Sequence, residues 1–255
     1  MKVIFITQND PFYTKYFFDR YLQIYPDIDY ELLGVFFLPP MNDSLLKLIK
    51  RTVNFYGKTN FLKMGARYAL IKTGEKFGLK TTAFNFLKKA GVKVSKIKDV
   101  NDKKFLDWID ASEVELIISI SAPQIFKQGL LEAAYIACVN IHSGLIPAYR
   151  GLFPNFWQML NGENSSTVTF HQMEAKIDKG NIVAEFQVKI DDNDSLTDLI
   201  RKTKFAAAEN VGKVINMYRE RKVKLYEHAD IAEHYYKFPG KEDIKRFLQT
   251  GRKLI

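Results

Sequence analysis

Asn140 and His142 stand two residues apart in VNIHSGLIPAYRG, residues 139–151. If this run begins as a strand, its alternating geometry places both side chains on one face. An amide N–H can donate to an oxyanion, and an imidazole can move a proton near neutral pH. The pair is therefore a candidate for acyl-transfer chemistry. The more common role of an Asn-x-His pair is to satisfy hydrogen bonds without any catalysis.

A carboxylate that could assist this pair occurs later, in EAKIDKGNI, residues 174–182. Asp178 could orient the imidazole of His142 and help to relay a proton. The alternative is an ordinary turn, because Asp-x-Gly is common turn chemistry and Gly180 follows. His171 lies on the flanking strand, and we expect it to be structural or exposed.

Strand-like runs alternate with helical patterns along the chain, which predicts an α/β fold. We expect a Rossmann-like, mostly parallel sheet with helices on both faces, because crossovers between parallel strands are right-handed. In such sheets ligands bind beyond the carboxyl ends of the strands, and His142 lies at such an end. The predicted strands are 3–7, 31–38, 91–97, 114–121 and 135–142.

The second half of the chain carries clear boundary signals. Residues 166–173 and 181–190 read as a pair of strands joined by a loop. Asp194 or Ser195 should cap the longest helix, residues 194–221, and Asn101 should cap a shorter helix earlier in the chain. A turn at Pro239 and Gly240 then introduces a short amphipathic helix.

Positive charge is concentrated in one segment. Residues 45–93 hold twelve lysines and arginines and one acid, Glu75, whereas the whole 255-residue chain has a net charge of +9. We interpret residues 41–90 as a helical insertion, capped by Asp43 or Ser44. Such a field attracts phosphates, nucleic acid or an anionic membrane, although a solvated lysine-rich helix face is an equal alternative. The aromatic residues predicted to pack this insertion are Phe55, Tyr56, Phe61, Tyr68, Phe77, Phe84 and Phe86.

Composition narrows the class of protein. Hydrophobic residues make up 47% and charged residues 26% of the chain, as in ordinary globular proteins. The single Cys138 excludes an intramolecular disulfide and fits a reducing compartment. The apolar run at the N-terminus is too short for a signal peptide core or a membrane span. We therefore expect a cytoplasmic protein, and we expect no metal site.

The segments NIHSGLIPAYRG, PNFW and STVTFHQMEAKIDKGNIV together resemble the folate-dependent formyltransferases. These include glycinamide ribonucleotide transformylases, methionyl-tRNA formyltransferases and N-formyltransferases of nucleotide-linked amino sugars. The family pattern is Asn-x-His, Leu-Leu-Pro, Arg-Gly and a later Asp before Gly. This chain has Ile146 in place of the second leucine. The resemblance covers roughly residues 90–200 and the opening strand.

The resemblance implies a reaction and its residues. The donor is expected to be 10-formyltetrahydrofolate, and Asn140, His142 and Asp178 are the expected catalytic residues. The resemblance also implies a cis peptide bond before Pro147. A flat pterin needs apolar walls and backbone hydrogen bonds. The expected folate-binding residues are Gln124, Ile125 and Phe126 of SAPQIF, together with Gln172, Met173 and Ile177.

The sequence says less about the amine that accepts the formyl group than about the donor. TQNDPFYTKY, residues 7–16, has no glycine where glycinamide ribonucleotide transformylases cradle a phosphate. Residues 222–255 form only a short extension after a catalytic domain of residues 1–221, too little for the extra domain of methionyl-tRNA formyltransferases. We therefore favour a small amine, namely a nucleotide-linked amino sugar. The candidate acceptor-binding residues are Asn9, Tyr13, Arg150 and Lys179, although Arg150 could instead tie its loop to the sheet.

Other functions stay open at this stage. A methionyl-tRNA formyltransferase-like enzyme, or one acting on glycinamide ribonucleotide or another amine, is the alternative within the family. A folate- or sugar-binding protein without catalysis is the alternative of another class. The sequence disfavours nucleic acid as a partner, since the basic segment lacks regularly placed aromatic platforms. Docking of the basic insertion on an anionic membrane or a partner protein is a third, less favoured possibility. The sequence leaves a homodimer open.

Overall fold

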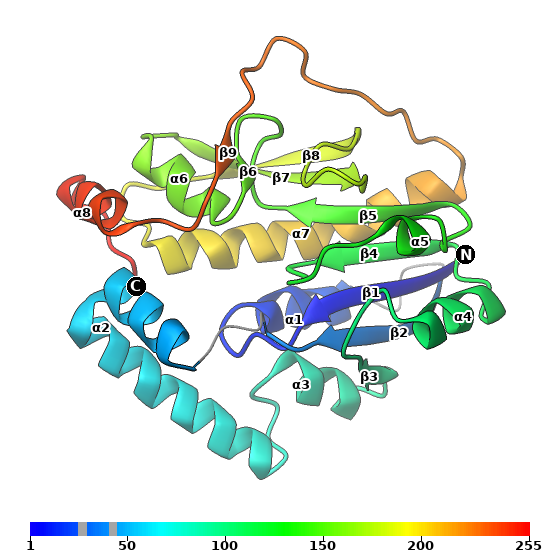
Figure 1. Cartoon of the computed structure of the whole chain (residues 1–255), viewed down its shortest axis with the longest axis horizontal. Coiled ribbons are helices and arrows are strands. Elements are labelled where there is room, and N and C mark those ends of the chain that lie inside the picture. Colours follow the sequence, from blue (N-terminus) through cyan, green and yellow to red (C-terminus); the bar gives the residue numbers. More distant parts are fainter. Residues whose placement is uncertain (25–29, 41–44) are drawn as a thin grey trace.

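The protein is built on a seven-stranded, mostly parallel sheet (Figure 1). A computed structural model describes residues 1–24, 30–40 and 45–255. The strand order is β3-β2-β1-β4-β5-β7-β8, and only the pairs β5–β7 and β7–β8 are antiparallel. The strands are β1 Lys2–Gln8, β2 Glu31–Leu38, β3 Val94–Lys96, β4 Leu116–Ile120, β5 Ala137–His142, β7 Ser165–Gln172 and β8 Ile182–Lys189. The α/β prediction and the strand pair predicted at 166–190 are confirmed.

Helices cover both faces of this sheet, because its central strands are apolar on both sides. Val3 and Phe5 of β1 pack into one hydrophobic core, and Ile4 and Ile6 pack into the other. The first core is closed by α1 and α7, and the second by α4 and α5 (Figure 1). The helices are α1 Thr14–Ile24, α2 Leu45–Lys76, α3 Ala83–Lys89, α4 Lys103–Ala111, α5 Gln128–Leu131, α6 Pro154–Leu160, α7 Leu196–Arg219 and α8 Lys241–Gln249.

Two predicted helix features are wrong. Asp102, and not Asn101, caps α4 by accepting a hydrogen bond from the Lys104 N–H, while the Asn101 amide donates to the Ile125 carbonyl. The longest helix is α2 with 32 residues rather than α7 with 24, because the chain stays helical on both sides of a kink at Gly57. The predicted cap at Asp43 or Ser44 lies outside the described residues.

The aromatic residues of the insertion are divided between core and surface. Phe55 is buried and its ring contacts those of Phe153 and Phe238, as expected. Tyr68 and Phe77 are exposed, so the expectation that they pack the insertion is wrong. The physical reason is that the second half of α2 runs along the outside of the molecule, with one face against solvent (Figure 1).

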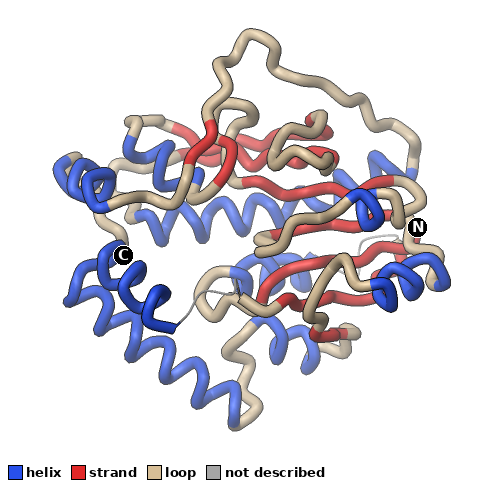
Figure 2. The backbone as a smooth tube through the Cα atoms, in the orientation of Figure 1, coloured by secondary structure: helices blue, strands red, loops and turns tan. Residues whose placement is uncertain are grey.

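The residues after α7 return to the main body of the protein. They first run as a long loop over the molecule (Figure 2). Strand β9, Tyr235–Tyr236, then pairs with β6, Arg150–Gly151. Finally, the buried Phe247 of α8 stacks on Phe156 of α6 at a ring distance of 4.8 Å. The C-terminal residues therefore share the main hydrophobic core.

Candidate functional site

The candidate site lies at the end of β5, where the sheet changes from parallel to antiparallel pairing. β5 pairs with β4 in parallel and with β7 in antiparallel register. That register places Asn140 opposite His171, and the Asn140 Nδ2 atom lies 3.1 Å from the His171 Nε2 atom. His142, two residues further on, is buried. Alternation along β5 places Asn140 and His142 on one face of the sheet, and both lie near the carboxyl end of this strand.

Asp178 reaches the same place from the loop between β7 and β8. Its Oδ2 atom lies 3.8 Å from His142 Nδ1, and its Oδ1 atom lies 3.6 Å from His171 Nε2. These separations exceed hydrogen-bond length, so the contacts are electrostatic. The carboxylate is fixed instead by the Gly151 N–H, which donates to Oδ2 at 2.9 Å. The structure therefore brings the amide, the imidazole and the carboxylate together.

The hydrogen bonds of the two imidazoles define their tautomers. A backbone carbonyl can only accept, so His142 Nε2, at 2.6 Å from the Tyr149 carbonyl, carries a proton. The same reasoning places a proton on His171 Nδ1, which donates to the Gln172 carbonyl at 3.0 Å. His171 Nε2 then accepts from Asn140, which orients the Asn140 carboxamide.

Burial and charge act in opposite directions on the two titrating groups. Burial lowers the pKa of His142, although the neighbouring Asp178 opposes this shift. Burial alone would raise the pKa of the Asp178 carboxyl, but the imidazoles of His142 and His171 and the Gly151 N–H hold that pKa well below its usual range. The lowered pKa of Asp178 favours an ionised carboxylate at the site.

Gly180 and Arg150 shape the loop that carries Asp178. A Cβ atom at Gly180 would lie 1.6 Å from the Gln172 carbonyl oxygen, so no larger residue fits this close approach. The buried Arg150 donates to the Ile177 carbonyl and pairs with Glu233. Lys179 also pairs with Glu233, at 2.9 Å. These contacts favour the loop-tying role for Arg150.

The residues predicted to hold folate fall into two groups. Ile125 and Ile177 are exposed and offer apolar surface next to polar backbone. Gln124 and Phe126 instead have structural roles. Gln124 accepts a hydrogen bond from the Val100 N–H and donates one to the Lys98 carbonyl, and Phe126 is buried in the second core. Gln172 and Met173 are likewise held, by the Tyr218 hydroxyl and by apolar packing.

Asn9 and Tyr13, two predicted acceptor-binding residues, lie on the loop after β1. Asn9 Nδ2 lies 3.4 Å from Glu75 Oε1, while its buried Oδ1 atom has no partner among the described residues. The Tyr13 hydroxyl lies 3.3 Å from that of Tyr56 on α2. Asn9 Oδ1 is thus a buried acceptor atom whose hydrogen-bonding capacity is unused among the described residues.

Two residues near the site make contacts that the sequence does not predict. His171 is buried, so the expectation that it is structural or exposed holds only in its first half. The sequence carries no signal for its contact with Asn140, because His171 faces Asn140 across the sheet and this depends on strand register. Lys204 of α7 is buried with its Nζ 2.7 Å from Ser121 Oγ, and burial lowers its pKa to about 8 against the opposing effect of Asp10. Helical spacing could have indicated the burial of Lys204, because Ala208, one helical turn further on, is also buried.

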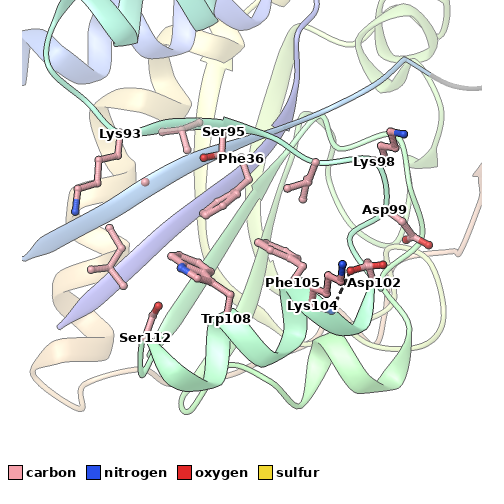
Figure 3. Close-up of a pocket in the computed structure, with 14 residues that line it drawn as sticks. Phe36, Lys93, Ser95, Lys98, Asp99, Asp102, Lys104, Phe105, Trp108 and Ser112 are labelled. Carbon is pink, nitrogen blue, oxygen red and sulfur yellow. Dashed lines mark hydrogen bonds between the residues drawn. The ribbon is translucent and has the colours of Figure 1, made fainter.

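A separate cavity of about 760 Å³ lies between β2, β3 and α4 (Figure 3). The rings of Phe36, Phe105 and Trp108 line it, and Lys93 and Lys98 lie at its rim. None of the predicted site residues lines it, so it is distinct from the site at β5. Within the described part of the chain, no three His, Cys, Asp or Glu side chains are arranged to hold a metal ion.

Comparison with known proteins relates this arrangement to a family. The family model described as formyl transferase matches residues 75–215. The bifunctional polymyxin resistance protein ArnA of Wigglesworthia glossinidia brevipalpis is 26% identical over 72% of this chain and 29% of its own length. The methionyl-tRNA formyltransferase of Clostridioides difficile is 29% identical over 60% of this chain and 51% of its own length. The chain thus spans about half or less of these relatives.

A solved structure of a formyl transferase has a similar fold. WlaRD, a sugar 3N-formyl transferase whose crystal structure was determined in the presence of dTDP and 5-N-formyl-THF, superposes with a TM-score of 0.57. The superposition covers 92% of this chain and 69% of WlaRD, at 20% sequence identity. At this identity the likeness concerns the fold. Among the described helices, none has the length and apolarity needed to cross a membrane.

Proposed function

Because this chain belongs to the formyl transferase family, we propose that it moves a formyl group from 10-formyltetrahydrofolate to the primary amine of a nucleotide-linked amino sugar. The observation that carries the proposal is the convergence of Asn140, His142 and Asp178 at the end of β5. An amide donor, an imidazole and a buried carboxylate are the groups that acyl transfer to an amine requires.

The proposed roles follow from the geometry of each group. When bound, the donor supplies an activated formyl carbonyl. Asn140 Nδ2 donates to the oxygen of that carbonyl as negative charge develops. His142 and Asp178 take up the proton lost by the attacking amine and return it to the departing folate nitrogen. In balance, one carbon–nitrogen bond forms, one breaks, and one proton moves between the two nitrogens.

The exposed Ile125 and Ile177 fit a flat heteroaromatic ring, because they offer apolar surface on two loops at this edge of the sheet. The backbone of residues 172–178 supplies the polar groups beside them. WlaRD, which has a related fold, was determined with a formyl-folate. We therefore propose that these loops hold the pterin.

For the acceptor, the unpartnered Oδ1 of Asn9 and the hydroxyl of Tyr13 are the proposed contacts. The presence of dTDP with WlaRD supports a nucleotide-linked sugar. The methionyl-tRNA formyltransferases among the relatives, with the lysines of α2, favour tRNA as the second candidate. A nucleotide-linked amino sugar and a tRNA are very different in size, so one assay that offers both acceptors distinguishes these two functions.

The test supplies 10-formyltetrahydrofolate with a panel of nucleotide-linked amino sugars, methionyl-tRNA and glycinamide ribonucleotide, and follows tetrahydrofolate release. We expect turnover with an amino sugar. His142→Ala and Asp178→Ala should each lower kcat by about 10²-fold or more, the scale of acid–base groups. The exposed Asp230→Ala serves as the matched control. Folate binding without turnover of any amine would instead identify a binding protein.

A further inference from the structure

Helix α2 has a second apolar stripe that the fold does not use. Its inner face is held by the buried Phe55 and Met64. Its outer face carries Leu62, Leu70 and, just after its end, Phe77, which are 71%, 74% and 77% exposed. Their spacing, with the exposed Ala66 and Ala69 between them, places these side chains on one helical face. An exposed apolar stripe of this kind marks an interaction surface.

Positive charge flanks the stripe on both sides. Lys58 and Lys76 lie along one margin of the outer face and Lys63 along the other, as the helical period requires. Among the described residues, none of these three lysines pairs with a carboxylate. The one acid of the helix, Glu75, already bonds Lys72 at 2.6 Å. The surface is therefore apolar along its centre and cationic at its margins.

We propose that this face of α2 docks on an anionic lipid membrane, with the apolar stripe among the acyl chains and the lysines against the headgroups. Basic amphipathic helices bind membranes by this combination of apolar burial and electrostatic attraction. The proposal reverses the sequence-based preference against a membrane partner. It is independent of the proposed formyl transfer, because the stripe contributes no residue to that site.

Two other occupants fit the surface less well. A second copy of the chain would bring the lysine margins of two helices together, with no free acid on α2 to compensate. RNA would pair with the lysines, but it offers no apolar surface for the protruding leucines. The helix that carries the stripe runs along the outside of the molecule (Figure 1), where an extended partner such as a lipid surface can reach it.

The test is co-sedimentation of the full chain with phosphatidylglycerol-containing vesicles and with pure phosphatidylcholine vesicles at low salt. We expect binding to the anionic vesicles alone. Leu62→Gln combined with Leu70→Gln should weaken it by at least about tenfold. Lys63→Gln and Lys76→Gln should weaken it by about fivefold each. The matched control is Leu248→Gln with Lys245→Gln, on the exposed side of α8, which should leave binding unchanged.

Three outcomes overturn the proposal. The first is equal binding, or no binding, to both kinds of vesicle. The second is binding that depends on the lysines but not on the leucines, which describes an electrostatic partner such as RNA. The third is a dimer in solution, measured by light scattering, that the leucine variant dissociates. Circular dichroism of each variant verifies its fold, and since both leucines are exposed we expect no change.

Discussion

Asn140 is held by a partner that its own strand does not supply. His171 accepts from the Asn140 amide and lies 3.6 Å from Asp178, so one buried ring contacts two of the three proposed catalytic residues. The strand period predicts that Asn140 and His142 lie near each other. It does not predict His171, because a contact across two strands depends on register, which a single sequence leaves undetermined.

We predict that His171→Leu lowers kcat about tenfold, because Asn140 then loses the acceptor that orients its amide. The effect on kcat should exceed the effect on the KM for the folate donor, since His171 contacts Asn140 and Asp178 and reaches the proposed folate loop only through the Gln172 carbonyl. His171→Gln retains an acceptor oxygen and should restore most of the rate. Steady-state kinetics of the two variants measure this. If both lose kcat equally while remaining folded, His171 does not act through that hydrogen bond.

We predict that Lys204 makes stability depend on pH above about 8. Burial lowers the pKa of Lys204 to about 8 in the folded state, whereas the unfolded side chain titrates near 10.4. The unfolded state therefore binds more protons between these values, and the free energy of unfolding rises with pH there, by roughly 3 kcal/mol. Urea denaturation at pH 8 and pH 10 measures the rise, and Lys204→Met should remove it. An equal rise in that variant would assign the effect to other groups.

At the scale of elements, two adjacent residues often compete to be the N-cap of a helix. The sequence offers Asp194 or Ser195 for α7, and the structure uses Ser195 with Asp198 in a reciprocal capping box. It offers Asn101 for α4, but loop packing engages the Asn101 amide elsewhere and leaves Asp102 to cap. Local pattern thus predicts where a helix begins to within one residue, and tertiary contacts choose the residue.

We predict that Ser195→Ala lowers the free energy of unfolding by about 1 kcal/mol, the usual effect of losing an N-cap. The variant removes the acceptor for the Asp198 N–H at the start of α7. Chemical denaturation with an unchanged slope provides the measurement. The exposed Asn193→Ala, just outside the helix, is the control and should have no effect. A loss no larger than that of the control would mean that water replaces the cap.

At the scale of the whole molecule, the alternation of strands and helices predicts the layered α/β architecture because the central strands are apolar on two faces. The insertion is predicted less well. The apolar residues of this basic segment fit either the protein interior or a partner outside the chain. The sequence predicts that Tyr68 and Phe77 pack the insertion, whereas both are exposed. The excess of lysine and arginine in this segment is the more informative signal, because it predicts a solvent-exposed helix face.

The long loop between α7 and β9 separates two parts of the chain that stay joined by other means. Residues 235–254 are anchored by the pairing of β9 with β6 and by the stacking of Phe247 on Phe156. Lys222 and Lys224 in the loop are exposed, so we expect trypsin to cleave there. We expect the two fragments to remain associated after such a cleavage, because these contacts do not depend on the loop. If the gene is divided at the same site, we expect the large N-terminal piece and the short C-terminal piece, produced separately, to reassemble.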